Sequence, residues 1–277
     1  MIMQIVSIVK YVRSNWTKWS ALFLIYFQEG LAYRASGLIW VVTDLTTAVT
    51  MPLVWAAASR NGPIAGYKTG DFVLYYLCIL MVGSFVTSHL MWDIAIEVRE
   101  GVFSSALLRP ISYFQLSFIR NITWRLFRPI LFLPFFLMLL VAYRPFLLGS
   151  QLHLDWKFWL SLLLGHLVSF NFVMAMSMIS LFVQEATAIF ELYYLPLLFL
   201  SGTVFPIAVL PPWVKVVSNF TPFYYTTGGC TEILIGRVTD QRAISIILTQ
   251  IGWVLVSFLA FRLLWSKGIK QYSGVGM

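Results

Sequence analysis

Residues 72–110 read FVLYYLCILMVGSFVTSHLMWDIAIEVREGVFSSALLRP and join two opposite kinds of sequence. The first part, Phe72–Trp92, has no Asp, Glu, Lys or Arg. A helix needs roughly 20 mostly apolar residues to cross a hydrocarbon core, because its backbone groups must be satisfied internally. The second part carries charges that would each cost about 2.5 to 3.5 kcal/mol at the bilayer centre. The stretch therefore predicts a membrane span followed by a segment in water.

The composition of the whole chain agrees with a membrane protein. Of its 277 residues, 60% are hydrophobic and 11% are charged, whereas a soluble domain has about 25% charged residues. Five more apolar runs are candidate spans, the second of which reaches span length only if its helix begins near Ile122: Ser36–Ala58, Pro129–Tyr143, Phe158–Val183, Ala186–Phe205 and Ala243–Phe261. We predict an all-α integral membrane protein with six transmembrane helices, forming one domain over residues 1–277.

The basic balance of the chain, with net charge +8 and pI about 9.6, bears on orientation. In a membrane protein Lys and Arg concentrate on the cytosolic side. Placing the N-terminus in the cytosol puts more of these residues inside than outside. We therefore expect a multi-pass protein of the plasma (inner) membrane with both termini in the cytosol, and no nucleic-acid partner.

Residues 1–33 precede the first span and have their own pattern. Val9, Val12 and Trp16 recur at helical spacing, while Lys10 and Arg13 take another face. Such a helix suits the headgroup layer of the membrane, and packing against the helix bundle would give the same pattern. We expect an amphipathic interfacial helix.

The segment 200–225 is apolar but contains four prolines. Proline cannot continue a regular helix without loss of backbone hydrogen bonds. We expect short helices that dip into the outer leaflet against protein; an ordinary loop with buried prolines is the alternative.

The charged stretch after Trp92 is expected to form a compact elbow. Gly101 allows the chain to bend, Ser104 or Ser105 is a candidate N-cap, and Pro110 ends a helical turn. The elbow would present an apolar surface that requires a partner protein, made of Val102, Phe103, Leu107 and Leu108. A solvated loop that only sets topology is the other interpretation.

The motifs GluValArgGluGly at 97–101 and LeuLeuArgPro at 107–110 resemble the sequence that follows the second membrane helix in permease subunits of type-2 ABC exporters. The proline-rich segment resembles the broken outer hairpin of the same class, and the resemblance covers nearly the whole chain. It implies that a cytosolic coupling region, residues 96–128, docks on a nucleotide-binding subunit. The coupling residues would be Glu97, Arg99, Glu100, Gly101, Leu107, Leu108, Arg109 and Pro110. The hairpin residues would be Ser201, Gly202, Pro206, Pro211, Pro212, Trp213 and Pro222.

The resemblance also implies partners. Two ATPase subunits would bind ATP and Mg, and a second permease, identical or similar, would complete the route through the membrane. This chain has no phosphate-binding GlyXXXXGlyLys(Ser/Thr) motif, so we expect it to bind no cofactor and not to be an enzyme itself. Its expected function is ATP-driven export of an amphiphilic, lipid-like or drug-like substrate.

Three polar residues within the spans are candidates for a substrate path: Asp44, Thr47 and Asn171. A carboxylate inside a membrane is a functional candidate, although the threonines around Asp44 could equally hold it as a structural pair. Two rival functions remain: an ion-coupled transporter that uses Asp44, and a membrane-embedded lipid-modifying enzyme. No cluster of acids and bases supports the second, and no metal site is expected because the histidines lie far apart in sequence.

Overall fold

The computed structural model describes residues 2–183 and 185–273, without the side chains of residues 2–15 and of Ser36. This part of the chain contains α-helices and short 3-10 helices (η) and no β-strand. In chain order the elements are α1 (Ile2–Ala32), α2 (Arg34–Ala58), η1 (Ser59–Asn61), α3 (Thr69–Val86), α4 (Leu90–Arg99), α5 (Val102–Leu107), α6 (Tyr113–Ala142), η2 (Arg144–Phe146), α7 (Trp156–Ser177), η3 (Met178–Leu181), α8 (Ala186–Leu200), η4 (Ile207–Val209), α9 (Pro212–Phe220), α10 (Pro222–Thr226), α11 (Gly228–Leu234) and α12 (Asp240–Gln271).

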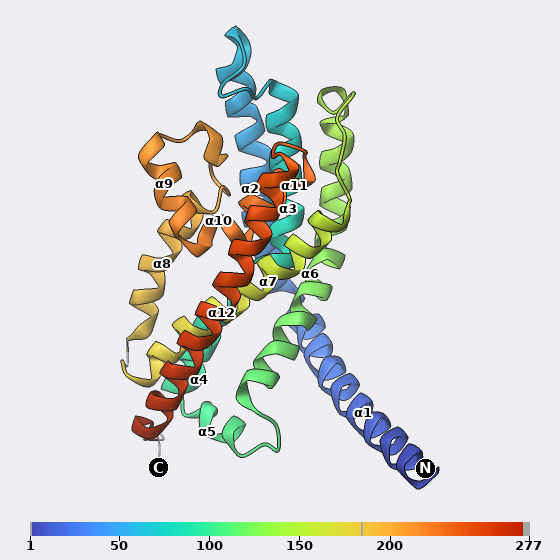
Figure 1. Cartoon of the computed structure of the whole chain (residues 1–277), viewed down its shortest axis with the longest axis vertical. Coiled ribbons are helices and arrows are strands. Elements are labelled where there is room, and N and C mark those ends of the chain that lie inside the picture. Colours follow the sequence, from blue (N-terminus) through green and yellow to red (C-terminus); the bar gives the residue numbers. More distant parts are fainter. Residues whose placement is uncertain (1, 184, 274–277) are drawn as a thin grey trace.

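The molecule is elongated and has two distinct ends (Figure 1). The start of α1, the helix α5 and the end of α12 lie at one end, which we call the elbow end. The short helices α9 and α11 lie toward the other, which we call the hairpin end. Each end has its own buried core, and α12 crosses α7 between them.

Within the described residues, five helical segments are long and apolar enough to cross a membrane: Gly37–Asn61, Thr69–Arg99, Tyr113–Ala142, Trp156–Leu181 and Asp240–Gln271. The chain is therefore a multi-pass membrane protein. The run predicted as a fifth span, Ala186–Phe205, forms the shorter helix α8 of 15 residues, about 22 Å long at 1.5 Å per residue. That is less than the roughly 30 Å of a hydrocarbon core, although α8 runs from the elbow end toward the hairpin end.

The third long helix differs from its prediction at its start. We expected it to begin near Ile122, but α6 begins at Tyr113. Ser112 is its N-cap, and the side-chain oxygen of Ser112 accepts a hydrogen bond from the backbone N–H of Gln115 at 3.3 Å. The amphiphilic first turns of this helix are stabilised by contacts with neighbouring helices, which hydropathy alone does not register.

The second span also differs, because it is not one continuous helix. The expected run Phe72–Trp92 is interrupted between Val86, where α3 ends, and Leu90, where α4 begins. Thr87 has an extended backbone, with φ −70° and ψ 121°. There is no proline at this point, so the interruption must be held by tertiary contacts.

Of the N-terminal segment, residues Ile2–Ala32 form a single helix, α1. The second half of α1 packs on α6: the rings of Phe27 and Phe127 meet edge to face at 5.5 Å, and Gly30 lies against Phe127. The face expected from Val9 and Val12 lies outside the described side chains. The described half of α1 therefore packs against the helix bundle, which was the alternative to a helix lying in the headgroup layer.

Candidate functional site

The elbow is a tight turn followed by a short helix. Gly101 has φ +77°, a left-handed conformation that glycine adopts without the steric cost of a Cβ. It is the N-cap of α5, so the expectation of an N-cap at Ser104 or Ser105 is wrong. Both serines lie inside α5, where the Ser105 hydroxyl donates to the carbonyl of Val102 at 2.7 Å.

An aromatic cluster fixes this short helix to the rest of the elbow end. Phe103 is fully buried, and its ring meets those of Tyr113 at 4.7 Å and Tyr272 at 5.1 Å. Tyr113 in turn stacks on Trp265 of α12 at 5.9 Å. The prediction that Phe103 belongs to the outward apolar surface is therefore wrong: it attaches α5 to α6 and to the end of α12.

The remaining apolar side chains of the elbow point outward. Leu108 is 87% exposed and Val102 is 52% exposed, and Leu107 is also exposed. The charged and proline residues around them are exposed as well: Arg99, Glu100, Arg109 and Pro110. These seven exposed side chains within residues 99–110 thus combine three apolar groups with three charges and a proline.

Glu97 has a different environment from the other predicted coupling residues. Its carboxylate accepts a hydrogen bond from the hydroxyl of Tyr113 at 2.6 Å and forms an ion pair with Arg120 of α6. Arg120 also reaches Asp93 at 3.5 Å. Glu97 therefore connects α4 to α6 behind the elbow, and it braces the surface that the exposed residues form.

The hairpin end is held by tyrosines of α3. The Tyr75 hydroxyl donates to the carbonyl of Gly202 at 2.8 Å, and the Tyr76 hydroxyl donates to that of Val204 at 2.7 Å. Gly202 has φ +86°, and a Cβ at this position would lie 2.5 Å from the Tyr75 oxygen. Ser201, which is also buried, accepts at its carbonyl from the Thr227 hydroxyl at 3.2 Å. The start of the proline-rich segment is thus tied to the second span.

The prolines of this segment separate short helices. Pro206 precedes η4, Pro211 is the N-cap of α9, and Pro212 and Pro222 are the first residues of α9 and α10. The outward stripe of α9 is apolar, with Trp213 70% exposed and Phe220 79% exposed. An exposed apolar stripe on a short helix suits a position in a leaflet rather than in water.

A buried acid in this region had no signal in the sequence analysis. Glu232 of α11 is almost fully buried, and its carboxylate accepts a hydrogen bond from the Tyr224 hydroxyl at 2.5 Å. Burial raises the pKa of Glu232 above its ordinary value, although the Tyr224 hydrogen bond and the charges of Arg242 and Lys215 partly oppose this shift. The segment GGCTEIL reads as an ordinary amphiphilic turn, so only the tertiary fold reveals the burial.

The three predicted substrate-path residues do not meet in one place. Asp44 of α2 forms an ion pair with Arg128 of α6. The threonines nearby instead donate to their own helix, as Thr43 does to the carbonyl of Ile39 at 3.0 Å, and Thr47 is half-buried on α2. Asn171 of α7 faces α12, where its side-chain amide donates to the carbonyl of Val254 at 3.4 Å.

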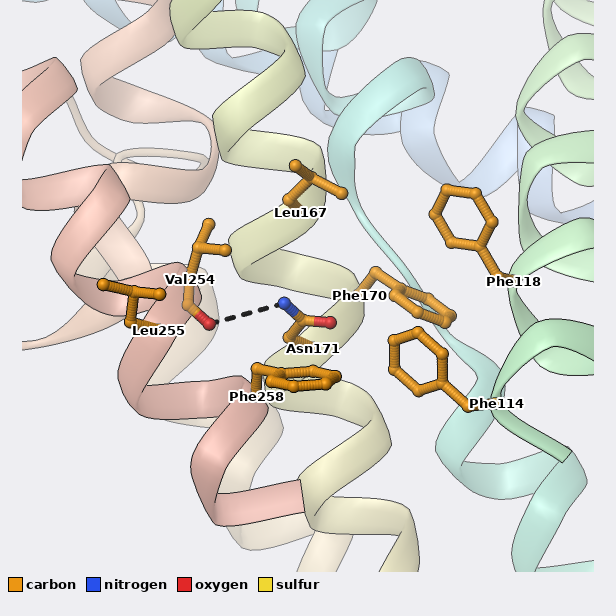
Figure 2. A pocket seen from close by; sticks show the side chains of 8 residues that line it. All are labelled: Phe114, Phe118, Leu167, Phe170, Asn171, Val254, Leu255 and Phe258. Atoms are coloured by element: carbon orange, nitrogen blue, oxygen red, sulfur yellow. Dashed lines mark hydrogen bonds between the residues drawn. The ribbon is translucent and has the colours of Figure 1, made fainter. Parts of the chain in front are cut away.

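Asn171 lines an apolar pocket between α6, α7 and α12 (Figure 2). The pocket has a volume of about 300 Å³. Its other lining residues are Phe114, Phe118, Leu167, Phe170, Val254, Leu255 and Phe258. The amide is thus the one polar side chain in a wall of phenylalanine and aliphatic groups, a composition that suits an alkyl chain rather than a charged group.

Within residues 2–183 and 185–273, no three His, Cys, Asp or Glu side chains are grouped so as to hold a metal ion.

The chain matches the model of a known protein family. Residues 45–276 match the model of a family described as "ABC-2 family transporter protein". The matched range contains the elbow, the interrupted second span and the hairpin, and it begins one residue after Asp44. No curated protein matches the chain.

Proposed function

This chain belongs to the ABC-2 transporter family, and on that premise we propose that it is the membrane subunit of an exporter that moves an amphiphile using ATP hydrolysed by separate subunits. Membership in this family implies that the chain is a permease and that it works with an ATPase subunit. ATP and Mg would bind to that partner, because this sequence has no phosphate-binding loop.

The observation that carries the proposal is the surface of the elbow. Leu108, Val102 and Leu107 expose apolar side chains outside the candidate spans. Apolar groups at the centre of a surface with charged flanks are typical of a protein interface. We infer that the elbow enters a groove of the ATPase on the cytosolic side, with both termini of the chain on that side as well.

The contacts behind this surface suit the transmission of a movement. Phe103 holds α5 against Tyr113 and Tyr272, and Glu97 holds α4 against Arg120. A displacement of the elbow by the ATPase would therefore be passed to α4, α6 and α12 together. Closure of two ATPase subunits would move these helices and alternate the access to the bound amphiphile.

The hairpin end suits the outer leaflet. In the proposed topology α8 and the proline-separated segment after it together make the fifth of six crossings, with the exposed stripe of Trp213 and Phe220 in the outer leaflet. A second permease, identical or similar, would face this one. The amphiphile would pass between the two halves and leave past the hairpins.

A reconstitution experiment tests the function. The permease and its ATPase are placed in liposomes with a fluorescent amphiphile, and export is followed after addition of ATP and Mg, of a nonhydrolysable ATP analogue, or of an ion gradient alone. The proposal predicts export with hydrolysable ATP only, undiminished by ionophores. Export driven by the ion gradient without nucleotide would contradict it and would favour a coupled transporter that uses Asp44.

A further inference from the structure

The second span is interrupted between α3 and α4 (Figure 1). Polar side chains of α6 and α7 contact the backbone around the interruption. The carbonyl of Ser84 accepts from the guanidinium of Arg125 at 3.3 Å, and the carbonyl of Phe85 lies 3.1 Å from Nδ1 of His166. The backbone N–H of Ser88 donates to the hydroxyl of Ser169 at 2.9 Å. Two helices, α6 and α7, therefore supply the partners that keep this span broken.

The N-terminus of α4 has no such partner. The first turn of a helix leaves backbone N–H groups without intrahelical acceptors, and no side chain of the described residues caps α4 at its N-cap, His89. Free N–H groups and the helix dipole make such an end attractive to anions. With ten residues, α4 is long enough for this effect.

The side chain of Arg125 gives an independent indication of a ligand. Arg125 is 95% buried, as its 5% exposure shows, and its Nε has no hydrogen-bond partner among the described residues. Its guanidinium binds the last turn of α3 and is within electrostatic range of His89, the N-cap of α4. An unused donor therefore lies at the interruption, against the last turn of α3.

Arg125 forms no ion pair of its own among the described residues. The carboxylate within electrostatic range of Arg125 is that of Asp44, which is already paired with Arg128. Two guanidinium groups thus share one carboxylate inside the membrane, where an unpaired charge is costly. The imidazoles of His89 and His166 and the amide of Asn121 also pack on this region. Two further carboxylates lie at the first turn of α4, and each has its own partner: Asp93 pairs with Arg120, and Glu191 of α8 accepts a hydrogen bond from the indole N–H of Trp92 at 3.3 Å.

The rim of this region is open at α2. The side chain of Asp44 is 37% exposed, and Trp40, whose ring stacks on that of His89 at 6.0 Å, is 54% exposed. Tyr194 of α8 also lies within electrostatic range of Asp44 and Arg128. A ligand that arrives between α2 and α8 would therefore meet Arg128 first and Arg125 behind it.

From this combination we propose that the interruption between α3 and α4 is an anion site that binds the phosphate- or carboxylate-type headgroup of the transported amphiphile. Arg125, Arg128 and the free N–H groups at the start of α4 donate to the headgroup, while its alkyl chain stays in apolar surroundings. The inference rests on the proposed function and narrows its cargo to anionic amphiphiles.

Binding of radiolabelled hexadecyl phosphate tests the site, with the permease and its ATPase assembled in phosphatidylcholine nanodiscs. We expect saturable binding that hexadecanoate displaces and hexadecyltrimethylammonium does not. Arg125→Gln should weaken binding at least about tenfold, Arg125→Lys should restore part of it, and Arg60→Gln, which removes an exposed arginine after α2, should leave it unchanged. Equal binding by the wild type and Arg125→Gln, or equal displacement by the cation, overturns the proposal.

A second variant covers the case in which Arg125→Gln does not fold. Asp44→Asn frees Arg128 from its carboxylate, so we expect it to tighten binding several-fold. Unchanged or weaker binding by Asp44→Asn counts against the site.

Two further measurements on the same samples separate the possible failures. ATP and Mg should release the bound hexadecyl phosphate if it occupies the route of the cargo; retention through turnover marks a resident lipid and overturns the cargo assignment. A complex that assembles and hydrolyses ATP without binding the anion removes this inference alone, whereas a permease that binds no ATPase removes the proposed function.

Discussion

Truncation of Leu108 to alanine should weaken docking of the ATPase without affecting the fold. Leu108 is 87% exposed, so it contributes little to the stability of the permease by itself. Leu→Ala removes three side-chain carbons, each worth about 0.8 kcal/mol when fully buried. Scaled by the exposed fraction, complete burial in a groove would contribute about 2 kcal/mol, which corresponds to about thirtyfold in Kd.

This value is an upper figure, because association also costs ordering of side chains and loss of free motion. The assay is biolayer interferometry of the ATPase on permease held in nanodiscs. Leu148→Ala is the matched control, since Leu148 is 78% exposed and lies at the hairpin end, in the loop after η2. We expect Leu108→Ala to raise Kd by between about five- and thirtyfold, and Leu148→Ala to leave it unchanged. Equal Kd values for the two variants would refute the reasoning.

Three further predictions concern the brace, the buried acid and the hairpin. Glu97→Gln removes the charge that pairs with Arg120 of α6 and weakens the hydrogen bond from Tyr113. The free energy of unfolding should therefore fall by about 1 to 3 kcal/mol, measured by thermal unfolding. An unchanged Tm would contradict the bracing role of Glu97. Because burial raises the pKa of Glu232 in the folded protein, its contribution to stability is fully present below the unfolded value of about 4.3 and is lost as pH rises toward the folded value. Glu232→Gln should therefore raise Tm more at pH 7 than at pH 4, and an equal effect at both pH values opposes this. Gly202→Ala forces an unfavourable φ, worth about 1 to 2 kcal/mol, and a clash with the Tyr75 hydroxyl. It should therefore lower Tm, whereas Gly252→Ala should not, because Gly252 lies inside α12 and a Cβ there would meet nothing within 4 Å.

Hydropathy predicted the helices whose sequence is uniformly apolar. The predicted spans Ser36–Ala58 and Phe158–Val183 correspond closely to α2 and to α7 with η3. The span Ala243–Phe261 lies within the longer helix α12. In such segments the backbone groups must be satisfied by internal hydrogen bonds, and a helix provides them. Little tertiary information is therefore needed to predict these helices.

The errors occurred where tertiary contacts decide the local structure. The interruption after Val86 carries no proline or adjacent glycine pair, and its one sequence sign is the polar triplet Thr87-Ser88-His89 within an apolar run. The triplet is broken because Arg125 and other side chains of α6 and α7 bond its flanking backbone. Similarly, α6 begins at Tyr113 because of its cap and its ion pairs, which lie outside a hydropathy average.

At the elbow, sequence identified the segment but not the orientation of every side chain. Leu107, Leu108 and Val102 are exposed, whereas Phe103 is buried between Tyr113 and Tyr272. The partners of Phe103 lie on α6 and beyond the end of α12, far away in sequence, so no local pattern distinguishes it from its apolar neighbours.

A single thiol at the tip of the elbow tests the central claim most directly. The chain's two cysteines, Cys78 and Cys230, are both buried, so Leu108→Cys adds one exposed site. Labelling by a membrane-impermeant maleimide is measured in intact cells and in inside-out vesicles, with and without bound ATPase. The account predicts labelling only in inside-out vesicles, and protection from it by the ATPase. Labelling from the cell exterior, or labelling that the docked ATPase leaves unchanged, would contradict it.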